Sequence, residues 1–265
     1  MKVLLVIIFF LRFSQLYSQE ITQIESLQSL YIEIFKEKEK LGNATGFIIK
    51  SSTRYYLVTN YHVITQKNPI NNDWLYPHSK LLPDRIEINC ISKNMESYVT
   101  ISQSLYDNNR NPIWYQRKIG KEIVDVVQIP LRDTSEVKFF PINYKTSGYD
   151  NVLITPTDRI FIIGFPLGFK GDQELPIWKS GLIASEPDFD QEGKPIIWVD
   201  AITFPGMSGS PAYFMSKETV RFKDGKYGLV RGPSKFMGVF SHTNSNVYGA
   251  LWKASFLAPI FDSLP

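Results

Sequence analysis

Short apolar runs separated by turn-forming residues dominate the pattern along this chain. Runs rich in β-branched and aromatic residues occupy positions 44–50, 55–59, 85–90, 98–101, 122–131, 159–163, 181–184, 196–199 and 236–240. Glycine, proline, asparagine and aspartate gather between them, as expected for many short strands. Strands that follow one another without helical segments favour a closed all-β architecture over β-α-β units. We therefore expect an all-β fold.

Helical periodicity is confined to the two ends of the chain. From residue 19 onward, apolar residues recur at helical spacing, although residues 31–35 also alternate as a strand would. We predict a short helix that passes into a first strand. At the other end, the spacing predicts one amphipathic terminal helix, carried by Trp252, Phe256, Leu257, Ile260, Phe261 and Leu264.

The first 18 residues have the pattern of a secretory signal peptide. Lys2 is followed by an apolar run over residues 3–11, and a more polar stretch then ends at the small residue Ser18. An uncleaved membrane anchor is the alternative, but the run is about half as long as a bilayer requires, and Arg12 interrupts it. The sequence thus predicts a secreted or periplasmic protein without stable membrane insertion after cleavage.

Composition narrows the possible classes of function. The 265 residues are 43% hydrophobic, enough for a large core or two modest ones. The chain has 29 Lys and Arg against 26 Asp and Glu, and loss of Lys2 and Arg12 leaves 27 against 26, or +1. So small a charge gives no reason to expect nucleic acid as a partner. The single cysteine, Cys90, allows no internal disulfide.

The three histidines show no metal-binding spacing. His62, His78 and His242 form neither an HExxH motif nor a Cys/His cluster, so we expect no metal and no cofactor. His78 lies in a loop rich in proline and asparagine and is expected to be solvated.

A glycine-flanked serine is the strongest candidate for chemistry. Ser208 lies in the turn 204–211, between the apolar runs 196–199 and 212–215. Glycines beside a serine leave its hydroxyl uncluttered and let backbone N–H groups converge on one point. The alternative is an ordinary turn, because tight connections commonly use glycine, proline and serine.

His62 and Asp125 supply the other parts of an acyl-transfer site. His62 directly follows the run 55–59, and Asp125 is a carboxylate inside the run 122–131. With Ser208 they provide a base, an orienting carboxylate and a nucleophile. A histidine satisfied within the core and a surface aspartate on an edge strand are the alternatives.

His242 is the rival base. An α/β-hydrolase would need the order Ser, Asp, His, which Ser208, Asp224 or Asp262, and His242 offer only in part. Such a site also requires the motif G-x-S-x-G, which Ser210 interrupts.

The segments around His62, Asp125 and Ser208 resemble those of the trypsin-like (chymotrypsin-fold) serine proteases. The resemblance covers nearly all of the mature chain. Residues 45–48 resemble the family's Gly-x-Gly-Phe strand, 59–63 its histidine segment and 125–129 its aspartate segment. In the C-terminal half, residues 162–168, 180–183 and 200–209 resemble bacterial HtrA-type sequences, and Gly-x-Ser-Gly-Ser-Pro is similar to the glutamyl endopeptidases.

The resemblance implies two closed six-stranded antiparallel β-barrels and a C-terminal helix. Residues 19–135 would form the barrel with His62 and Asp125, and residues 136–265 the barrel with Ser208. The oxyanion hole would be the backbone N–H groups of Gly206 and Ser208. Ser210 stands where a glycine is commoner in the family and adds a Cβ close to this hole. Met207 stands where digestive members have an aspartate that pairs with a new N-terminus, so we expect no such processing step.

Specificity is also inferred from the resemblance. Ile202, six residues before Ser208, replaces the carboxylate that selects Lys or Arg. Phe240 stands where glutamyl endopeptidases carry a histidine, so Glu preference is not expected unless His242 substitutes. Ile202, Phe204 and Phe240, with His242 nearby, predict an apolar substrate pocket.

Two classes of function remain open. The first is an exported serine endopeptidase with a polypeptide substrate. The second is a chymotrypsin-fold module that binds peptides or proteins without turnover, because a fold does not fix function.

Overall fold

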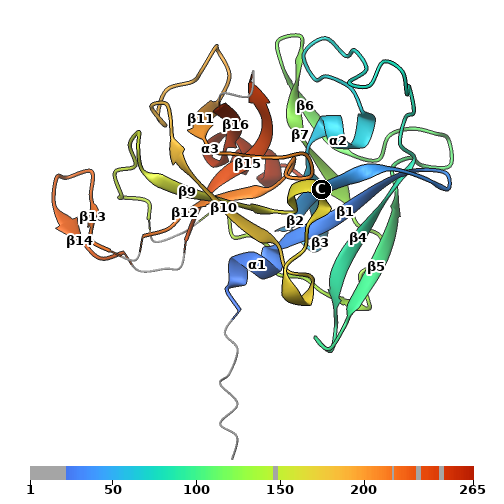
Figure 1. Cartoon of the computed structure of the whole chain (residues 1–265), viewed down its shortest axis with the longest axis horizontal. Coiled ribbons are helices and arrows are strands. Elements are labelled where there is room, and N and C mark those ends of the chain that lie inside the picture. The colour runs from blue at the N-terminus through green and yellow to red at the C-terminus, as the bar shows by residue number, and fades with distance from the viewer. Residues whose placement is uncertain (1–21, 146–148, 217, 231–233, 245–247) are drawn as a thin grey trace, which may run out of the picture.

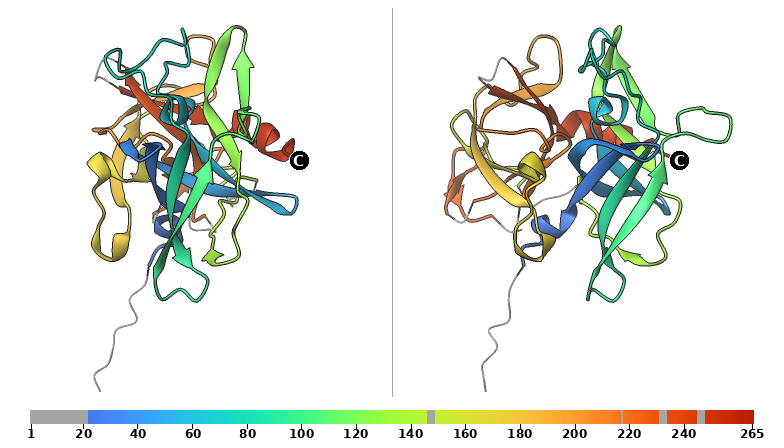
Figure 2. Two further views of the ribbon diagram at one scale, coloured as in Figure 1. Left: turned by 90° about the vertical axis from the view of Figure 1, so that its right-hand side faces the viewer. Right: turned by 45° about the vertical axis from the view of Figure 1, so that its right-hand side comes forward.

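Two β units lie side by side in the computed structural model, which describes residues 22–145, 149–216, 218–230, 234–244 and 248–265. The signal-peptide prediction for residues 1–18 lies outside the described residues. In Figure 1 the N-terminal unit runs from blue to green on the right, and the C-terminal unit from yellow to red on the left. The right-hand view in Figure 2 shows the same separation.

The N-terminal unit is an antiparallel sheet that follows a short helix. The helix α1 (Ile24–Gln28) passes directly into β1 (Ser29–Lys36), as the periodicity predicts. The strand order is β5-β4-β1-β2-β3-β7-β6, with β8 paired to β4. The remaining strands are β2 (Glu39–Ser51), β3 (Arg54–Thr59), β4 (Arg85–Ser92), β5 (Tyr98–Ser104), β6 (Tyr115–Ile119), β7 (Glu122–Pro130) and β8 (Val137–Lys138).

The C-terminal unit is a closed barrel with the strand order β10-β11-β16-β15-β12-β9. Its strands are β9 (Arg159–Gly164), β10 (Ile177–Ile183), β11 (Ile196–Asp200), β12 (Pro211–Phe214), β15 (Lys235–Asn244) and β16 (Tyr248–Lys253). Two 3-10 turns, η1 (Pro166–Gly168) and η2 (Asp172–Glu174), lie between β9 and β10, and β13 (Val220–Arg221) pairs with β14 (Tyr227–Gly228) as a separate ribbon.

The all-β prediction is confirmed for the described chain, and one of the two predicted barrels closes. In the N-terminal sheet, β5 and β6 are the two edges, and no ladder among the described residues joins them. Both edges carry largely exposed residues. This sheet also extends past residue 135 through β8, and the division at residues 135 and 136 stays a prediction.

Apolar side chains form three clusters, one within each unit and one between them. The cluster between the units joins Phe47 and Tyr56 of the N-terminal sheet to Trp252, Leu257 and Phe261. Leu257 and Phe261 lie on the terminal helix α3 (Ala254–Asp262), which therefore helps to hold the two units together. Trp252 belongs to β16 and not to this helix, so the helix begins later than its apolar spacing predicts.

None of the helices among the described residues has the length and apolar character needed to cross a membrane.

Candidate active site

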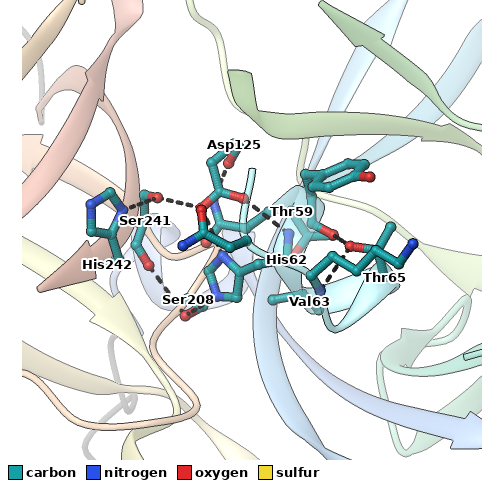
Figure 3. A network of polar contacts seen from close by, with 12 residues as sticks. Thr59, His62, Val63, Thr65, Asp125, Ser208, Ser241 and His242 are labelled. Carbon is teal, nitrogen blue, oxygen red and sulfur yellow. Dashed lines mark hydrogen bonds and ion pairs between the residues drawn. The ribbon is translucent and has the colours of Figure 1, made fainter. Parts of the chain in front are cut away.

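Three distant segments place His62, Asp125 and Ser208 in one hydrogen-bonded chain (Figure 3). The Nδ1 atom of His62 lies 2.7 Å from Oδ2 of Asp125, and its Nε2 atom lies 2.9 Å from Oγ of Ser208. Asp125 is acceptor-only when ionised, so Nδ1 carries the ring proton and Nε2 presents a lone pair to the serine hydroxyl. The Ser208 hydroxyl also lies 3.2 Å from the Ser241 carbonyl oxygen, but the contact with His62 is the shorter one.

The backbone around His62 is fixed by the same aspartate. His62 lies in α2 (Tyr61–Thr65), a single helical turn that follows β3 directly. Its backbone N–H donates to Oδ1 of Asp125 over 2.9 Å, and the Asn60 side-chain amide donates to the Asp125 carbonyl oxygen over 2.6 Å. These two bonds hold α2 against β7, which orients the imidazole.

Asp125 is a buried carboxylate with several donors around it, and only 1% of it is exposed. Burial by itself would raise the pKa of Asp125, but the His62 ring and hydrogen bonds from His62 and Ser241 outweigh it. The pKa of Asp125 therefore lies below its ordinary value. The carboxylate stays ionised and is able to stabilise an imidazolium.

Ser241 is a polar partner of the site that the sequence did not reveal. It lies on β15 and is buried, and its hydroxyl donates to Oδ2 of Asp125 over 2.5 Å. Its one sequence signal is its place beside His242 at the end of an apolar run. Strand residues in such runs are usually part of the core, so the signal does not point to the aspartate.

Thr45 joins the serine turn to the N-terminal sheet. Its backbone N–H donates to the Ser208 carbonyl oxygen over 3.0 Å, and its hydroxyl donates to the Gly206 carbonyl oxygen over 2.8 Å. The same hydroxyl accepts the Phe165 N–H over 3.1 Å. One threonine on β2 thus holds two segments of the C-terminal unit.

The turn requires glycine at position 206. Gly206 has φ +95°, and a Cβ there would overlap the Phe165 carbonyl oxygen. The Leu167 N–H donates to the Pro205 carbonyl oxygen over 2.6 Å. Because the described peptide bonds are trans, the Gly206 N–H points in the opposite direction from that carbonyl. Within the described chain, neither this N–H nor that of Ser208 has a hydrogen-bond partner, so both are free to bind a ligand oxygen.

The Ser210 side chain lies against Gly164 at the end of β9. It is fully buried, and its Oγ occupies the space that a Cβ on Gly164 would need, at the junction of β9 with Thr45. No hydrogen-bond partner of this Oγ is found in the described part of the chain.

The four residues of the predicted apolar pocket lie in different environments. Phe240 is 2% exposed and packs in the barrel core against Gly249, whereas Ile202 and Phe204 are 72% and 43% exposed. The Phe204 ring lies under the Lys179 ammonium at 5.5 Å. His242 contacts Ser241. The positions do not define one shared lining, and the pocket stays a prediction.

The rival α/β-hydrolase triad does not assemble. Asp224 is exposed beside Lys226, and Asp262, at the end of α3, pairs with Lys145 and Tyr144. The ring of His242 contacts the Ser241 hydroxyl, whereas Ser208 contacts His62.

Other polar groups give no sign of a metal site. No group of three or more metal-ligating side chains occurs in the described ranges. His78 is exposed in the loop between α2 and β4. Cys90 is buried and unpaired, and burial raises the pKa of its thiol to about 12.

Comparison with known proteins gives one matching family and several solved structures of low sequence identity. Residues 44–220 match the trypsin-like peptidase domain, a range that contains His62, Asp125 and Ser208. A search of curated proteins found no significant match.

Solved structures of proteases resemble the chain at low identity. The serine endoprotease from Yersinia pestis has 14% identity and a TM-score of 0.49, with 92% of this chain and 67% of that chain covered. Rv3671c from Mycobacterium tuberculosis has 14% identity, a TM-score of 0.47 and coverages of 91% and 90%. The MamO protease domain from Magnetospirillum magneticum has 13% identity, a TM-score of 0.47 and coverages of 89% and 97%. Structural similarity at this level does not support conclusions about the site.

The family match is the stronger finding because it extends over about two thirds of the sequence. The chain belongs to the trypsin-like peptidase family and is a serine-type endopeptidase.

Proposed function

We propose that the protein is an exported endopeptidase that cuts polypeptides through an acyl-enzyme intermediate on Ser208. The observation that carries this proposal is the unbroken chain from Ser208 Oγ through the His62 ring to Asp125, with contacts of 2.9 and 2.7 Å. Both contacts lie in the range expected of a nucleophile and its base.

In the first half of the reaction, His62 Nε2 takes the proton of Ser208 as Oγ bonds to the peptide carbonyl carbon. The imidazolium then gives that proton to the leaving amine as the C–N bond breaks. In the second half, His62 takes a proton from water, whose oxygen attacks the acyl group, and the proton returns to Ser208. Asp125 holds the tautomer and stabilises the imidazolium throughout.

The carbonyl oxygen gains negative charge in each half. The Gly206 and Ser208 N–H groups are the proposed donors to it, and each such donor contributes about 10²–10³ in rate. The direction of the Gly206 N–H is supported by the Leu167 contact with the Pro205 carbonyl oxygen.

We further propose that residues 1–18 direct export and that the mature protein is secreted or periplasmic. An apolar side chain before the cut bond is the expected substrate preference, since Ile202 replaces a selecting carboxylate. A peptide-library profile dominated by Arg, Lys or Glu would contradict this preference.

Activation by a newly cut N-terminus is not expected. Met207 is fully buried among apolar side chains of the barrel core and has no charge to offer an amino group. Chains that begin at residue 19, with or without a short N-terminal extension, should therefore react with a serine probe at equal rates. A requirement for a defined N-terminal residue would contradict this expectation.

Labelling of the mature chain by a fluorophosphonate probe, with the modified residue mapped, tests the proposed function. We expect labelling at Ser208, loss of labelling and peptide hydrolysis in Ser208→Ala, and retention of both in Ser210→Ala, which removes a hydroxyl from the same turn. If wild-type protein is not labelled, or if Ser208→Ala keeps its biological activity, the result favours the alternative function, a module that binds peptides or proteins without turnover.

A further inference from the structure

A second imidazole is attached to the triad carboxylate. The ring of His242 lies with Nδ1 at 2.9 Å from the Ser241 hydroxyl oxygen, and this hydroxyl lies 2.5 Å from Oδ2 of Asp125. Figure 3 shows the three residues in a row, on the side of Asp125 away from the α2 backbone. The site therefore has a polar chain that runs from Ser208 through His62, Asp125 and Ser241 to the imidazole of His242.

The number of hydrogens on each group fixes the direction of each hydrogen bond in this chain. A serine hydroxyl has one hydrogen to donate, and an ionised carboxylate has none. The contact of 2.5 Å between Ser241 and Asp125 is typical of a hydroxyl that donates to a carboxylate. The Ser241 hydrogen is thus committed to Asp125, so the hydrogen of the other contact must be on Nδ1 of His242.

We propose that His242, as the Nδ1–H tautomer, is a positioning residue that aims the Ser241 hydroxyl at Asp125. The inference rests on the proposed function of the triad, because it describes how that triad is held. In the other tautomer, with the hydrogen on Nε2, Nδ1 would be an acceptor and would compete with Asp125 for the Ser241 hydrogen. The Nδ1–H tautomer removes that competition and keeps a third donor on the carboxylate, beside the ring and the backbone N–H of His62.

Charged groups surround His242 from several elements. Desolvation lowers the pKa of His242; Asp125 on β7 and Glu192 oppose the lowering, whereas His62 on α2 and Lys194 add to it. Lys194 in turn pairs with Glu122 of β7 over 2.8 Å. The net direction favours a neutral ring, even though His242 is an exposed residue. A neutral ring carries a single hydrogen, so its tautomer matters.

Nitrogen NMR of the histidine rings tests the tautomer without using activity. The chain has three histidines, and variants at His78 and His242 assign their signals. We expect neutral His242 as the Nδ1–H form and solvated His78 mainly as the Nε2–H form. Finding His242 as the Nε2–H form in the folded wild-type protein would overturn the proposal, even if the serine probe labels Ser208.

A pair of amide variants tests the positioning role. The amide nitrogen of His242→Asn can occupy the place of Nδ1, whereas that of His242→Gln occupies the place of Nε2. We expect His242→Asn to keep kcat within about twofold and His242→Gln to lose roughly five- to tenfold in kcat with KM nearly unchanged, the size of about one net hydrogen bond. His78→Gln is the matched control and should not change either constant.

A double-mutant cycle separates this role from a general structural effect. Because His242 acts through Ser241, the loss caused by His242→Gln should vanish in a Ser241→Ala background. Equal losses in the Asn and Gln variants, or a Gln effect that persists without the Ser241 hydroxyl, would overturn the proposal. Failure of the triad itself would be recognised separately, as absence of labelling at Ser208 with the NMR result intact.

Discussion

The Thr45 hydroxyl donates a hydrogen bond to the Gly206 carbonyl oxygen over 2.8 Å, across a sequence separation of 161 residues. It joins β2 of the N-terminal sheet to the turn that carries Ser208. The turn that carries the proposed oxyanion donors is thus held by a residue of the other unit.

Replacement of Thr45 should separate the hydroxyl from the shape of its side chain. Thr45→Val keeps the branched shape but leaves the Gly206 carbonyl oxygen and the Phe165 N–H without their partner. We expect kcat/KM to fall about tenfold in Thr45→Val, as for loss of about one net hydrogen bond, and to stay near the wild-type value in Thr45→Ser. Steady-state kinetics on one peptide substrate measures both. Equal losses in the two variants would point to packing as the cause.

Gly206→Ala should abolish labelling of Ser208 by a serine probe. The added Cβ would overlap the Phe165 carbonyl oxygen, and the positive φ disfavours any side chain. Gly225→Ala is the matched control, because Gly225 also has a positive φ, of +84°, but has open space around it. The control should keep its labelling rate. If Gly206→Ala reacts as fast as wild type, this turn does not supply the oxyanion donor.

Asp125 should make stability depend on acid pH. Its pKa is lowered in the folded protein, so its contribution is complete above the unfolded value of about 4 and is lost as the pH falls through the folded value. Urea unfolding should show wild type more stable than Asp125→Asn at pH 7, by an amount that shrinks at lower pH. Ser241→Ala removes one donor to the carboxylate, so the pH-dependent part of its stability should be smaller than in wild type, and its loss should be complete at a higher pH. A constant difference between wild type and Asp125→Asn down to pH 2 would contradict the lowered pKa.

Glu25 should be a destabilising residue. It is fully buried on α1, and neither carboxylate oxygen has a hydrogen-bond partner among the described residues. Removal of an unsatisfied buried polar group in favour of an apolar one gains about 1–3 kcal/mol. We therefore expect Glu25→Leu to raise the free energy of unfolding in urea by this amount, while Glu39→Leu, at an exposed position, should leave it nearly unchanged. A loss of stability in Glu25→Leu would show that the carboxylate has a donor outside the described residues.

The side chains of the triad could be found in the sequence because their chemistry and local settings are both distinctive. A serine between glycines, a histidine directly after an apolar run and an aspartate inside another run are unusual in one chain. Their order and the segments around them also led to the family. Short runs between turn residues were likewise enough to predict the all-β fold.

The supporting residues of the site were decided by tertiary structure. Ser241 and Asp125 are 116 residues apart, and no local pattern pairs them. The register between β15 and β16 shifts between Phe240 and Thr243, so alternation along the strand does not tell which way the side chains between them point. In the folded chain Phe240 enters the core and Ser241 reaches Asp125. Sequence periodicity reports which face of a regular strand is apolar, but only packing of the two units fixes the contacts made at an irregular one.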